Sequence, residues 1–576
     1  MTDPRLYRLG CDIGGTFTDF VLLDQSTGGF RIGKVLTTPD DPSRAVEEGI
    51  VDLQATEPQL LEKTEYLIHG TTLVINALIE RKGAKTALIT TSGFRDVLEM
   101  RREMRYDVHN IFAPYPTPLV PRELRREVRE RIAGTGEVLI SLDPAEVAVL
   151  LDGLVDAGVT AVGVCFLHSY RNPAHEQAVA RIAAERHPQL AVSVSSEVMP
   201  ELKEFERVST TVVNAYVQPL VDRYLARLEE RLGSQQFARR LFLMLSSGGV
   251  SSTAIARKFP VRLVESGPVG GAIAAAHIGR EAGLPNVVSF DMGGTTAKSC
   301  FIRGGRMPTT VDFEVDRVHR FKKGSGTPIA VPTADVIEIG AGGGSIAQVN
   351  ALNVIQVGPE SASAAPGPIS YRRGGTRPTV TDADLVLGYL DAGYFLGGRM
   401  ALDVEGARQG IAEAIGDPLG LSVEEAAWGV HEVVNENMAS AARIHIAENS
   451  GDATTAVLVG FGGAGPVHAY GVARKIGCRR ILFPRGAGVF SALGMVIAPV
   501  SFEVSRSNVT LLNDLDPAAM EASFAALEAE AADVVRSAVS GAEIDTIREL
   551  GMSYRGQAHQ LRITIAEPET PQLTTP

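Results

Sequence analysis

Two short stretches of the chain share an unusual frame of residue types. DIGGTFTD runs from Asp12 to Asp19 and DMGGTTAK from Asp291 to Lys298, so both contain Asp-x-Gly-Gly-Thr. Apolar residues precede each frame, which predicts strands joined by a tight hairpin turn. The backbone N–H groups and threonine hydroxyl of such a turn can point at one phosphate group. The aspartate repels phosphate, but it can hold Mg²⁺ through water and position a nucleophile.

The repetition makes these turns informative. A single Gly-Gly-Thr turn is weak evidence, because such turns also occur in ordinary hairpins. Two of them, one in each of two domains, could hold a nucleoside triphosphate from both sides of a cleft. The sequence therefore predicts a duplicated fold that supplies two phosphate-binding hairpins.

A third glycine turn joins a strand-like to a helix-like segment in TTAVLVGFGGAGPVHAYGVARKIG, which begins at Thr454. The turn itself, Gly460 to Pro466, would bring a helix N-terminus close to a nucleotide. It resembles the dinucleotide motif GxGxxG only loosely, since that motif needs an early βαβ unit and an acidic residue about 20 residues on. This turn lies late in the chain, and two arginines stand in that region. GGFRIGKV, from Gly28 to Val35, lacks the Ser or Thr that completes a P-loop.

Strand-like and helix-like segments alternate along the chain, which predicts an α/β architecture. Residues 142–198 show the clearest alternation, helix–strand–helix–strand, and this βαβ pattern requires a parallel sheet. A long helical stretch, about residues 203–233, should be interrupted near Pro219. The Gly-, Ser- and Pro-rich segment 340–375 has the composition of a linker, although its apolar residues fit ordered loops around a site at least as well. From about Val504 we expect a long Ala/Glu-rich helix followed by paired strands.

Composition excludes several classes of protein. The 576 residues carry a formal net charge of −13, which argues against a nucleic-acid partner. Four cysteines lie far apart without a CxxC pair, as is typical of buried thiols in a reducing compartment. The N-terminal MTDPRLYRLG lacks the regions of a signal peptide, and no apolar run reaches the roughly 18 residues of a membrane span. We therefore expect a soluble, cytoplasmic protein without a membrane partner.

The order of the three glycine turns is similar to that of the actin/Hsp70/sugar-kinase ATPase superfamily. Within it, the chain closely resembles the hydantoinase A/5-oxoprolinase family. The stretches that carry the resemblance are DIGGTFTDF, HGTTLVINALIERKGAKTALITTSGFRDVLEM, SFDMGGTTAK, VIEIGAGGGSIA, VGPESASAAPGP, TVTDADLVLG, GFGGAGPVHA and SYRGQAHQL.

This resemblance implies an α/β fold with two actin-like ATPase (ribonuclease H-like) domains flanking a nucleotide cleft, and inserted and C-terminal α/β parts. We expect an N-terminal domain over residues 1–200 with the first phosphate turn. A core domain over 201–503 should carry the second phosphate turn and the adenosine turn. A C-terminal domain over 504–576 looks truncated, because family chains usually continue further.

The resemblance also implies ATP-dependent chemistry on a carbonyl. Family members open cyclic amides or imides of the hydantoin or 5-oxoproline type through phosphorylation of the carbonyl oxygen. They usually act with a hydantoinase B-type subunit, so a hetero-oligomer is expected. The alternative enzyme is a subunit of an ATP-dependent ketone carboxylase of the acetone or acetophenone type. A non-catalytic ATP-binding scaffold is an alternative of another class, and a sugar kinase fits the GAGGGS and GPESASAAPGP segments poorly.

The same resemblance assigns roles by position, with ATP and Mg²⁺ as cofactors. Asp12 and Asp291 are the expected catalytic carboxylates and the ligands of Mg²⁺, either directly or through water. The expected phosphate and adenosine contacts are Gly14, Gly15, Thr16 and Thr18 in the first turn, Gly293, Gly294, Thr295 and Thr296 in the second, and Gly462, Gly463 and Gly465 in the third. Lys298 could neutralise phosphate charge or be a solvated strand residue.

Other candidates carry a weaker signal. His69 ends a strand in HGTT and could be catalytic or a packing histidine. Asp335 and Glu338 could hold a metal or be exposed loop acids. Arg101, Arg102 and Arg105 could bind a carboxylate, but a solvated basic helix face is favoured. We expect His468 to pack within its helix, and the sequence has no HExxH or CxxC pattern of a zinc site.

Overall fold

The computed structural model describes residues 7–38, 41–237, 240–319, 322–539, 541–557 and 560–565. The chain divides into two compact units, Met1–Pro499 and Val500–Pro576. The predicted boundary between residues 200 and 201 falls inside the first unit and stays a prediction.

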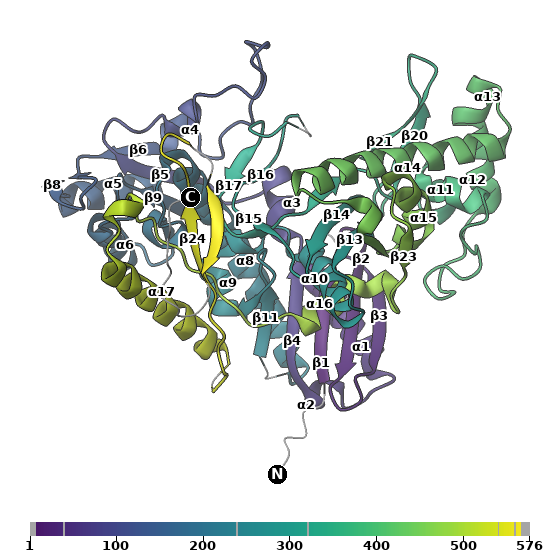
Figure 1. Ribbon diagram of the computed structural model, residues 1–576, viewed down its shortest axis with the longest axis horizontal. Coiled ribbons are helices and arrows are strands. Elements are labelled where there is room, and N and C mark those ends of the chain that lie inside the picture. Colours follow the sequence, from purple (N-terminus) through teal and green to yellow (C-terminus); the bar gives the residue numbers. More distant parts are fainter. Residues whose placement is uncertain are drawn as a thin grey trace. The chain divides into compact units, whose positions relative to one another are not determined.

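The first unit contains a six-stranded sheet that begins with the predicted hairpin (Figure 1). Strands β1, β2 and β3 pair as consecutive antiparallel neighbours, while β4 and β11 extend the sheet in parallel on the other side of β1. In the order of the sheet, the strands are β12 (Val250–Ser252), β11 (Arg240–Met244), β4 (Thr64–Thr71), β1 (Tyr7–Ile13), β2 (Phe17–Asp24) and β3 (Phe30–Leu36). Parallel neighbours need crossover connections, which here contain α1 (Pro42–Gln54) and α8 (Glu204–Ser234).

A five-stranded sheet in the same unit repeats this plan. Its hairpin β13–β14 is antiparallel, and β13 also pairs in parallel with β22, which pairs in parallel with β23. The strands, in order, are β19 (Ile337–Ile339), β14 (Ala297–Arg303), β13 (Asn286–Met292), β22 (Val457–Phe461) and β23 (Arg480–Leu482). Each sheet thus has a hairpin whose first strand continues into parallel pairing. This confirms the predicted α/β fold with two actin-like sheets.

The predicted βαβ segment forms a separate four-stranded parallel sheet, in the order β10-β9-β5-β6. Its strands are β10 (Ala191–Val194), β9 (Ala161–Cys165), β5 (Thr86–Thr91) and β6 (Arg125–Val128), and its helices include α5 (Pro144–Asp156) and α6 (Ala174–Arg186). Val162, Val164 and Leu151 are among the fully buried residues of its core. The parallel sheet expected from residues 142–198 is therefore confirmed.

The expected interruption of the long helix is wrong. Helix α8 runs unbroken over 31 residues with Pro219 inside it. Proline removes only its own N–H from the helix ladder, so a helix that is buried elsewhere can tolerate one such loss. Val217, Val221 and Tyr224 are buried around the proline and anchor both halves of the helix.

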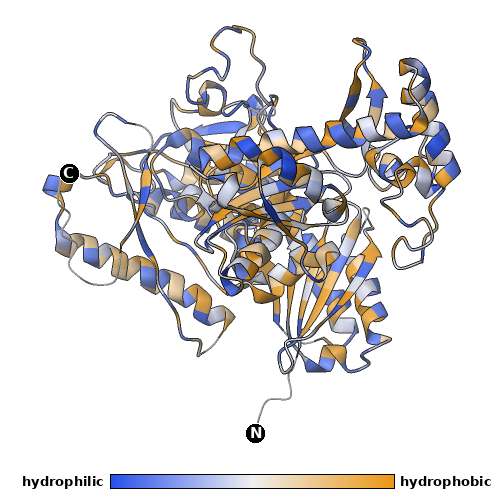
Figure 2. Cartoon of the chain, turned by 45° about the vertical axis from the view of Figure 1, so that its right-hand side comes forward, coloured by the Kyte–Doolittle hydropathy of each residue, from blue (hydrophilic) through white to orange (hydrophobic). Residues whose placement is uncertain are grey.

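Two helices meet closely between the two actin-like sheets. Helix α10 (Ser266–Glu281) packs on α16 (Phe490–Ile497) through glycines, since a β-carbon on Gly494 would lie only 1.7 Å from the carbonyl oxygen of Gly270. This contact fixes the N-terminus of α10 near the first hairpin. Figure 2 shows that the strands and the helices next to them are mostly hydrophobic, as core elements should be.

The glycine-rich segment 340–375 is ordered. It contains the antiparallel pair β20 (Ser345–Val349) and β21 (Ile355–Ser361), and Ile346, Ala347 and Val357 are buried. The helices after this segment include α11 (Val380–Val386), α14 (Val423–Glu448) and α15 (Gly465–Ile476). The interpretation as loops around a site therefore fits better than a flexible linker.

The second unit contains the helix and hairpin expected there. Helix α17 (Pro517–Ala538) is followed by the antiparallel strands β24 (Arg548–Met552) and β25 (Leu561–Ile565). Arg548 joins helix and hairpin through ion pairs with Glu521 and Glu528. In the described part of the chain, no helix has both the length and the apolar character needed to cross a membrane.

Candidate functional site

The two Gly-Gly-Thr turns have the same internal geometry. The Gly14 N–H donates to the Phe17 carbonyl oxygen at 2.9 Å, and the Gly293 N–H donates to the Thr296 carbonyl oxygen at 3.0 Å. In both hairpins, the glycine that makes this hydrogen bond directly follows the last residue of the strand that carries the aspartate. The structure confirms that the repeated frame builds the same turn twice.

The two turns face each other. A β-carbon placed on Gly294 would lie 3.1 Å from Thr16 Oγ1, and one on Gly15 would lie 3.9 Å from Thr295 Oγ1. Because glycine has no side chain, the backbone N–H groups of the two turns stay accessible where the turns approach each other. The arrangement offers N–H groups and two threonine hydroxyls to one small region, as phosphate binding from two sides requires.

Each sheet carries a row of charged side chains that starts at its aspartate. Asp12 lies opposite Asp19, and Asp19 lies opposite Lys34. Directly opposed residues share a face of a sheet, so these three side chains line one face of the first sheet. Lys34 Nζ lies 2.5 Å from Asp19 Oδ1.

The second sheet has an equivalent row of Asp291, Lys298 and Glu338. Lys298 Nζ lies 3.4 Å from Glu265 Oε2 and 3.6 Å from Glu338 Oε1, and only 15% of the lysine side chain is exposed. The coulombic effects of these carboxylates and of Asp291 outweigh burial and raise the pKa of Lys298. The solvated alternative for Lys298 is therefore wrong, and Glu338 is its partner rather than an isolated loop acid.

Asp12 is a buried carboxylate with an unused acceptor. Its Oδ1 has no hydrogen-bond partner among the described residues. A β-carbon on Gly267, in the first turn of α10, would lie 3.0 Å from this oxygen, so the N-terminus of that helix is aimed at the carboxylate. A helix N-terminus favours negative charge.

Burial raises the pKa of Asp12 to about 7, and repulsion from Asp19 and Asp291 adds to the effect. A carboxyl group with this pKa exchanges protons near neutral pH, so Asp12 can act as a base or an acid. The Asp12 Oδ1 atom, which has no hydrogen-bond partner among the described residues, could also bind a metal ion. The predicted Mg²⁺ at Asp12 needs such an available oxygen.

Asp291 is enclosed by the third glycine turn. A β-carbon on Gly462 would lie 2.3 Å from Asp291 Oδ1, and Gly462 has φ of +89°, which favours glycine. The Ala464 N–H donates to the Met292 carbonyl oxygen at 2.8 Å, and Gly465 begins α15. Burial raises the pKa of Asp291 to about 6 against the opposing charge of Lys298. The structure thus brings the second and third turns together.

His69 lies away from this arrangement. It pairs with Cys11 in the parallel register of β1 and β4, so its side chain shares a face with Cys11, opposite to that of Asp12. The ring is fully buried, and its Nε2 lies 2.6 Å from the Tyr224 hydroxyl of α8. Burial lowers the pKa of His69 to about 4. These contacts favour the packing alternative, and a catalytic role for His69 stays an unsupported prediction.

The loop that contains Gly342, Gly343 and Gly344 contacts the second turn, although the sequence analysis gave these three glycines no role of their own. The Gly343 N–H donates to the Gly293 carbonyl oxygen at 3.0 Å, and the Gly344 N–H donates to the Gly294 carbonyl oxygen at 2.6 Å. A β-carbon on Gly342 would lie 2.6 Å from the Gly294 carbonyl oxygen. The glycine run GAGGGS is the signal that could have identified this support for the second turn.

Two cavities lie among the residues that the structure describes in the first unit. A cavity of about 910 Å³ is lined by β3, α1 and residues 371–400. Its cationic lining residues are Lys34, Arg44, Arg231, Arg372, Arg373 and Arg399, against three acidic ones. Four of these cations, Lys34, Arg231, Arg372 and Arg399, form ion pairs with carboxylates of the protein, and Lys34 connects the cavity to the Asp12 row.

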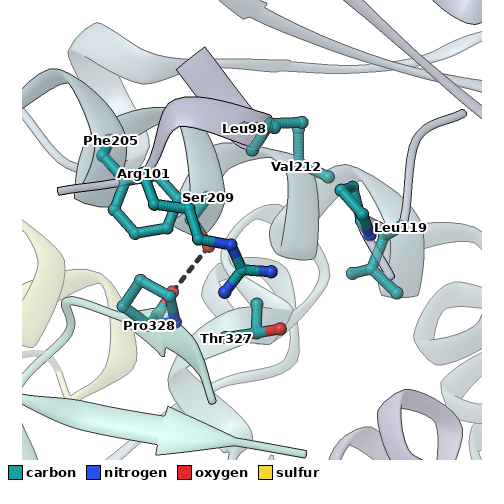
Figure 3. Close-up of a pocket in the computed structure, with 9 residues that line it drawn as sticks. Leu98, Arg101, Leu119, Phe205, Ser209, Val212, Thr327 and Pro328 are labelled. Carbon is teal, nitrogen blue, oxygen red and sulfur yellow. Dashed lines mark hydrogen bonds between the residues drawn. The ribbon is translucent and has the colours of Figure 1, made fainter. Parts of the chain in front are cut away.

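The second cavity, shown in Figure 3, has a volume of about 20 Å³, room for about one water molecule. It includes Arg101, whose Nη2 donates to the Pro116 carbonyl oxygen at 2.6 Å. Arg102 Nε donates to Glu206 Oε1 at 2.6 Å. Arg101 and Arg102 are therefore held by the protein itself.

The sequence was compared with known families and proteins. Residues 207–504 match the family described as Hydantoinase/oxoprolinase, and residues 8–187 match its N-terminal region. Caprolactamase subunit alpha of Pseudomonas jessenii is 36% identical over 97% of this chain and 80% of that protein. Acetophenone carboxylase gamma subunit of Aromatoleum aromaticum is 35% identical over 86% of this chain and 69% of that protein.

Solved structures agree with these matches. The crystal structure of ATP-dependent caprolactamase from Pseudomonas jessenii has a TM-score of 0.84 at 34% identity, covering 97% of this chain and 81% of that one. Nucleotide-free acetone carboxylase has a TM-score of 0.79 at 28% identity, with the same two coverages. The chain therefore belongs to the hydantoinase/oxoprolinase family, which includes ATP-dependent amidohydrolases and carboxylases.

Proposed function

We propose that this chain is the ATP-using subunit of an enzyme that opens a cyclic amide or imide by phosphoryl activation of the carbonyl oxygen. The observation that carries the proposal is the buried Asp12 carboxylate, whose Oδ1 is free of protein partners beside two facing Gly-Gly-Thr turns. One relative similar in both sequence and structure, caprolactamase subunit alpha, supports a cyclic amide as the substrate.

In this proposal, the backbone of the two turns binds the phosphates of ATP. Thr16 and Thr295 add hydroxyl donors, and Gly462, Gly463 and Gly465 leave space for the adenosine. Asp12 and Asp291 would hold Mg²⁺, which neutralises phosphate charge when bound. Lys298 is already held by two carboxylates, so it balances the charge of the site as a fixed cation.

Asp12 would also handle the proton of the reaction. As the amide oxygen takes the phosphoryl group and ADP leaves, the amide nitrogen loses its proton, and the Asp12 carboxylate can accept it. The product of this step is an O-phosphorylated imidate, which water can then attack at carbon.

A partner subunit is part of the proposal. The caprolactamase and acetophenone carboxylase relatives are named as the alpha and gamma subunits of their enzymes. We propose a hydantoinase B-type partner and a hetero-oligomer, with ring opening completed in the complex.

The second candidate is a ketone carboxylase subunit. It is favoured by the acetophenone carboxylase relative and by the acetone carboxylase structure. The same residues would phosphorylate an enolate oxygen, so their geometry serves either substrate. Only the carbonyl compound that triggers ATP turnover separates the two enzymes.

The test is ATP turnover by the native complex, purified through a tag on this chain from its own cells. The panel contains cyclic amides, imides, and ketones with bicarbonate. We expect turnover with one cyclic amide or imide, and its loss in Asp12→Asn and Asp291→Asn with ATP binding retained. Asp312→Asn, which changes an exposed carboxylate, is the matched control.

The other outcomes overturn the proposal in distinguishable ways. Turnover that depends on a ketone and bicarbonate would identify a carboxylase. ATP binding without turnover under any condition, with a partner present, would identify a non-catalytic scaffold. Full turnover in Asp12→Asn would remove Asp12 from the chemistry.

A further inference from the structure

A cluster of three buried side chains lies outside the facing turns. Asp384 of α11, His431 of α14 and His468 of α15 converge although 84 residues separate the first from the last. His431 Nδ1 lies 2.9 Å from Asp384 Oδ1, and His468 Nε2 lies 3.0 Å from Asp384 Oδ2. Each side chain is at most 6% exposed.

His468 has a polar neighbour at each ring nitrogen. Its Nδ1 lies 2.8 Å from Asn435 Oδ1, and its Nε2 lies 3.0 Å from Asp384 Oδ2. Asp384 therefore meets two imidazole rings at its two carboxylate oxygens. A buried carboxylate needs a compensating positive charge, which a metal ion shared with the two imidazoles can supply.

We propose that Asp384, His431 and His468 form a binding site for a zinc-class divalent metal ion that joins helices α11, α14 and α15. Two imidazoles and one carboxylate suit Zn²⁺, whereas Mg²⁺ and Ca²⁺ prefer oxygen ligands alone. The three ligand atoms all lie within 4.8 Å of one another. Ligands of a tetrahedral zinc ion are separated by about 3.3 Å, so side-chain adjustments of no more than about 1.5 Å would bring the three ligand atoms to that spacing.

The surroundings of the cluster are those of a metal site. The second ring nitrogen of a histidine ligand usually has a fixed hydrogen-bond partner, and the Asn435 amide holds this position beside His468. The rings of His431 and His468 are stacked with centroids 4.6 Å apart, and Trp428 stacks on His431 at 5.6 Å. These aromatic contacts fix the ligand orientation and limit access of water.

The position of the site indicates a structural role. Helix α15 follows the third glycine turn, and the ion would hold it to α11 and α14. This role is independent of the reaction proposed above. A structural ion should raise the thermal stability of the first unit, and this stabilisation should be the same with and without ATP.

The test is the metal content of the full chain after loading with Zn²⁺ alone and removal of unbound metal. We expect about one equivalent of zinc per chain, X-ray absorption with nitrogen and oxygen ligands that include imidazole, and a visible spectrum of tetrahedral Co²⁺ after exchange. A chelator should lower the Tm by several degrees, and added Zn²⁺ should restore it.

Variants connect the ion to these residues. His468→Gln and His431→Gln should lose the zinc and the chelator effect. His175→Gln is the matched control, because His175 is also buried and its Nδ1 lies 2.7 Å from a carboxylate oxygen of Glu130. This control should keep the zinc.

Absence of zinc in the loaded protein overturns the proposal, since a proton then bridges Asp384 and His468. Zinc retained by folded His468→Gln also overturns it. If the variants do not fold, the absorption spectra of the unaltered protein decide, because a site without imidazole ligands is not this one.

Discussion

At the scale of single residues, Asp12 links charge to stability. Its pKa of about 7 in the folded protein lies above the ordinary value of 3.8, so the folded state binds the proton more tightly than the unfolded state. The stabilisation by the neutral form is complete below pH 4 and is lost as pH rises through 7. Each tenfold change in proton affinity corresponds to about 1.4 kcal/mol, so a few kcal/mol are involved.

Replacement of Asp12 by asparagine, which stays neutral, should remove the loss of stability that accompanies rising pH. In buffer without nucleotide and magnesium, Asp12→Asn should come closest to the unaltered protein in Tm near pH 4 and should exceed it by a growing margin up to pH 8. Thermal unfolding at several pH values measures the difference, with Asp312→Asn as the control. A Tm difference that does not change with pH would contradict the raised pKa.

The third turn makes a prediction about two adjacent glycines. Gly462→Ala would place a β-carbon 2.3 Å from Asp291 Oδ1 at a positive φ, whereas a β-carbon on Gly463 has no neighbour within 4 Å among the described residues. We expect Gly462→Ala to lose about 1–3 kcal/mol of stability and most ATP affinity. Gly463→Ala should fold normally. Calorimetry of unfolding and of ATP binding compares them, and equal behaviour of both variants would refute the close approach.

Residue spacing predicted the facing turns but not every side chain near them. Asp12, Asp291 and the glycines were identifiable because the hairpin needs these residue types within one short frame. The face on which His69 points depends on the register between β1 and β4, which local sequence does not set. Likewise, Asp384, His431 and His468 come from three distant helices, so no spacing motif marks them.

At the scale of elements, the long helix α8 shows how burial overrides a local signal. Proline normally costs about 3 kcal/mol inside a helix. The expectation of a break near Pro219 failed because α8 buries residues on both sides of it against the surrounding core. Tertiary packing of this kind is not visible in local helix propensity.

The destabilisation of α8 by Pro219 should still be measurable. Pro219→Ala supplies an N–H for the Ala215 carbonyl and removes the ring, so it should raise the free energy of unfolding by about 1–2 kcal/mol after the gain in unfolded-chain entropy is subtracted. Arg223→Ala, on an exposed position of the same helix, is the control. Chemical denaturation measures both, and a Pro219→Ala variant no more stable than the control would show that the helix bends around the proline without cost.

At the scale of the molecule, the duplicated hairpin sheets explain both the repeated motif and the large first unit. The parallel pairing of β1 with β4 and of β13 with β22 ties each phosphate turn to strands far along the chain. Local motifs could therefore predict the hairpins. The alternation over residues 142–198 predicted the parallel pairing of β9 and β10, but not that β5 and β6 join the same sheet. The way α10 and α16 connect the two sheets through glycines could not be predicted, because it depends on contacts between distant segments.

The first unit should fold without the second. The hydrophobic core clusters found in the described residues all lie before Pro499, and the backbone contact of Val250 with Pro499 closes the first sheet within this unit. A chain ending at Pro499 should therefore unfold in one cooperative transition and bind ATP as tightly as the full chain. Differential scanning calorimetry and ATP titration test this, and a chain ending at Ile339, which cuts the second actin-like sheet before β22, is the control that should not fold. A non-cooperative transition in the chain ending at Pro499 would show that residues 500–576 complete the fold of the first unit.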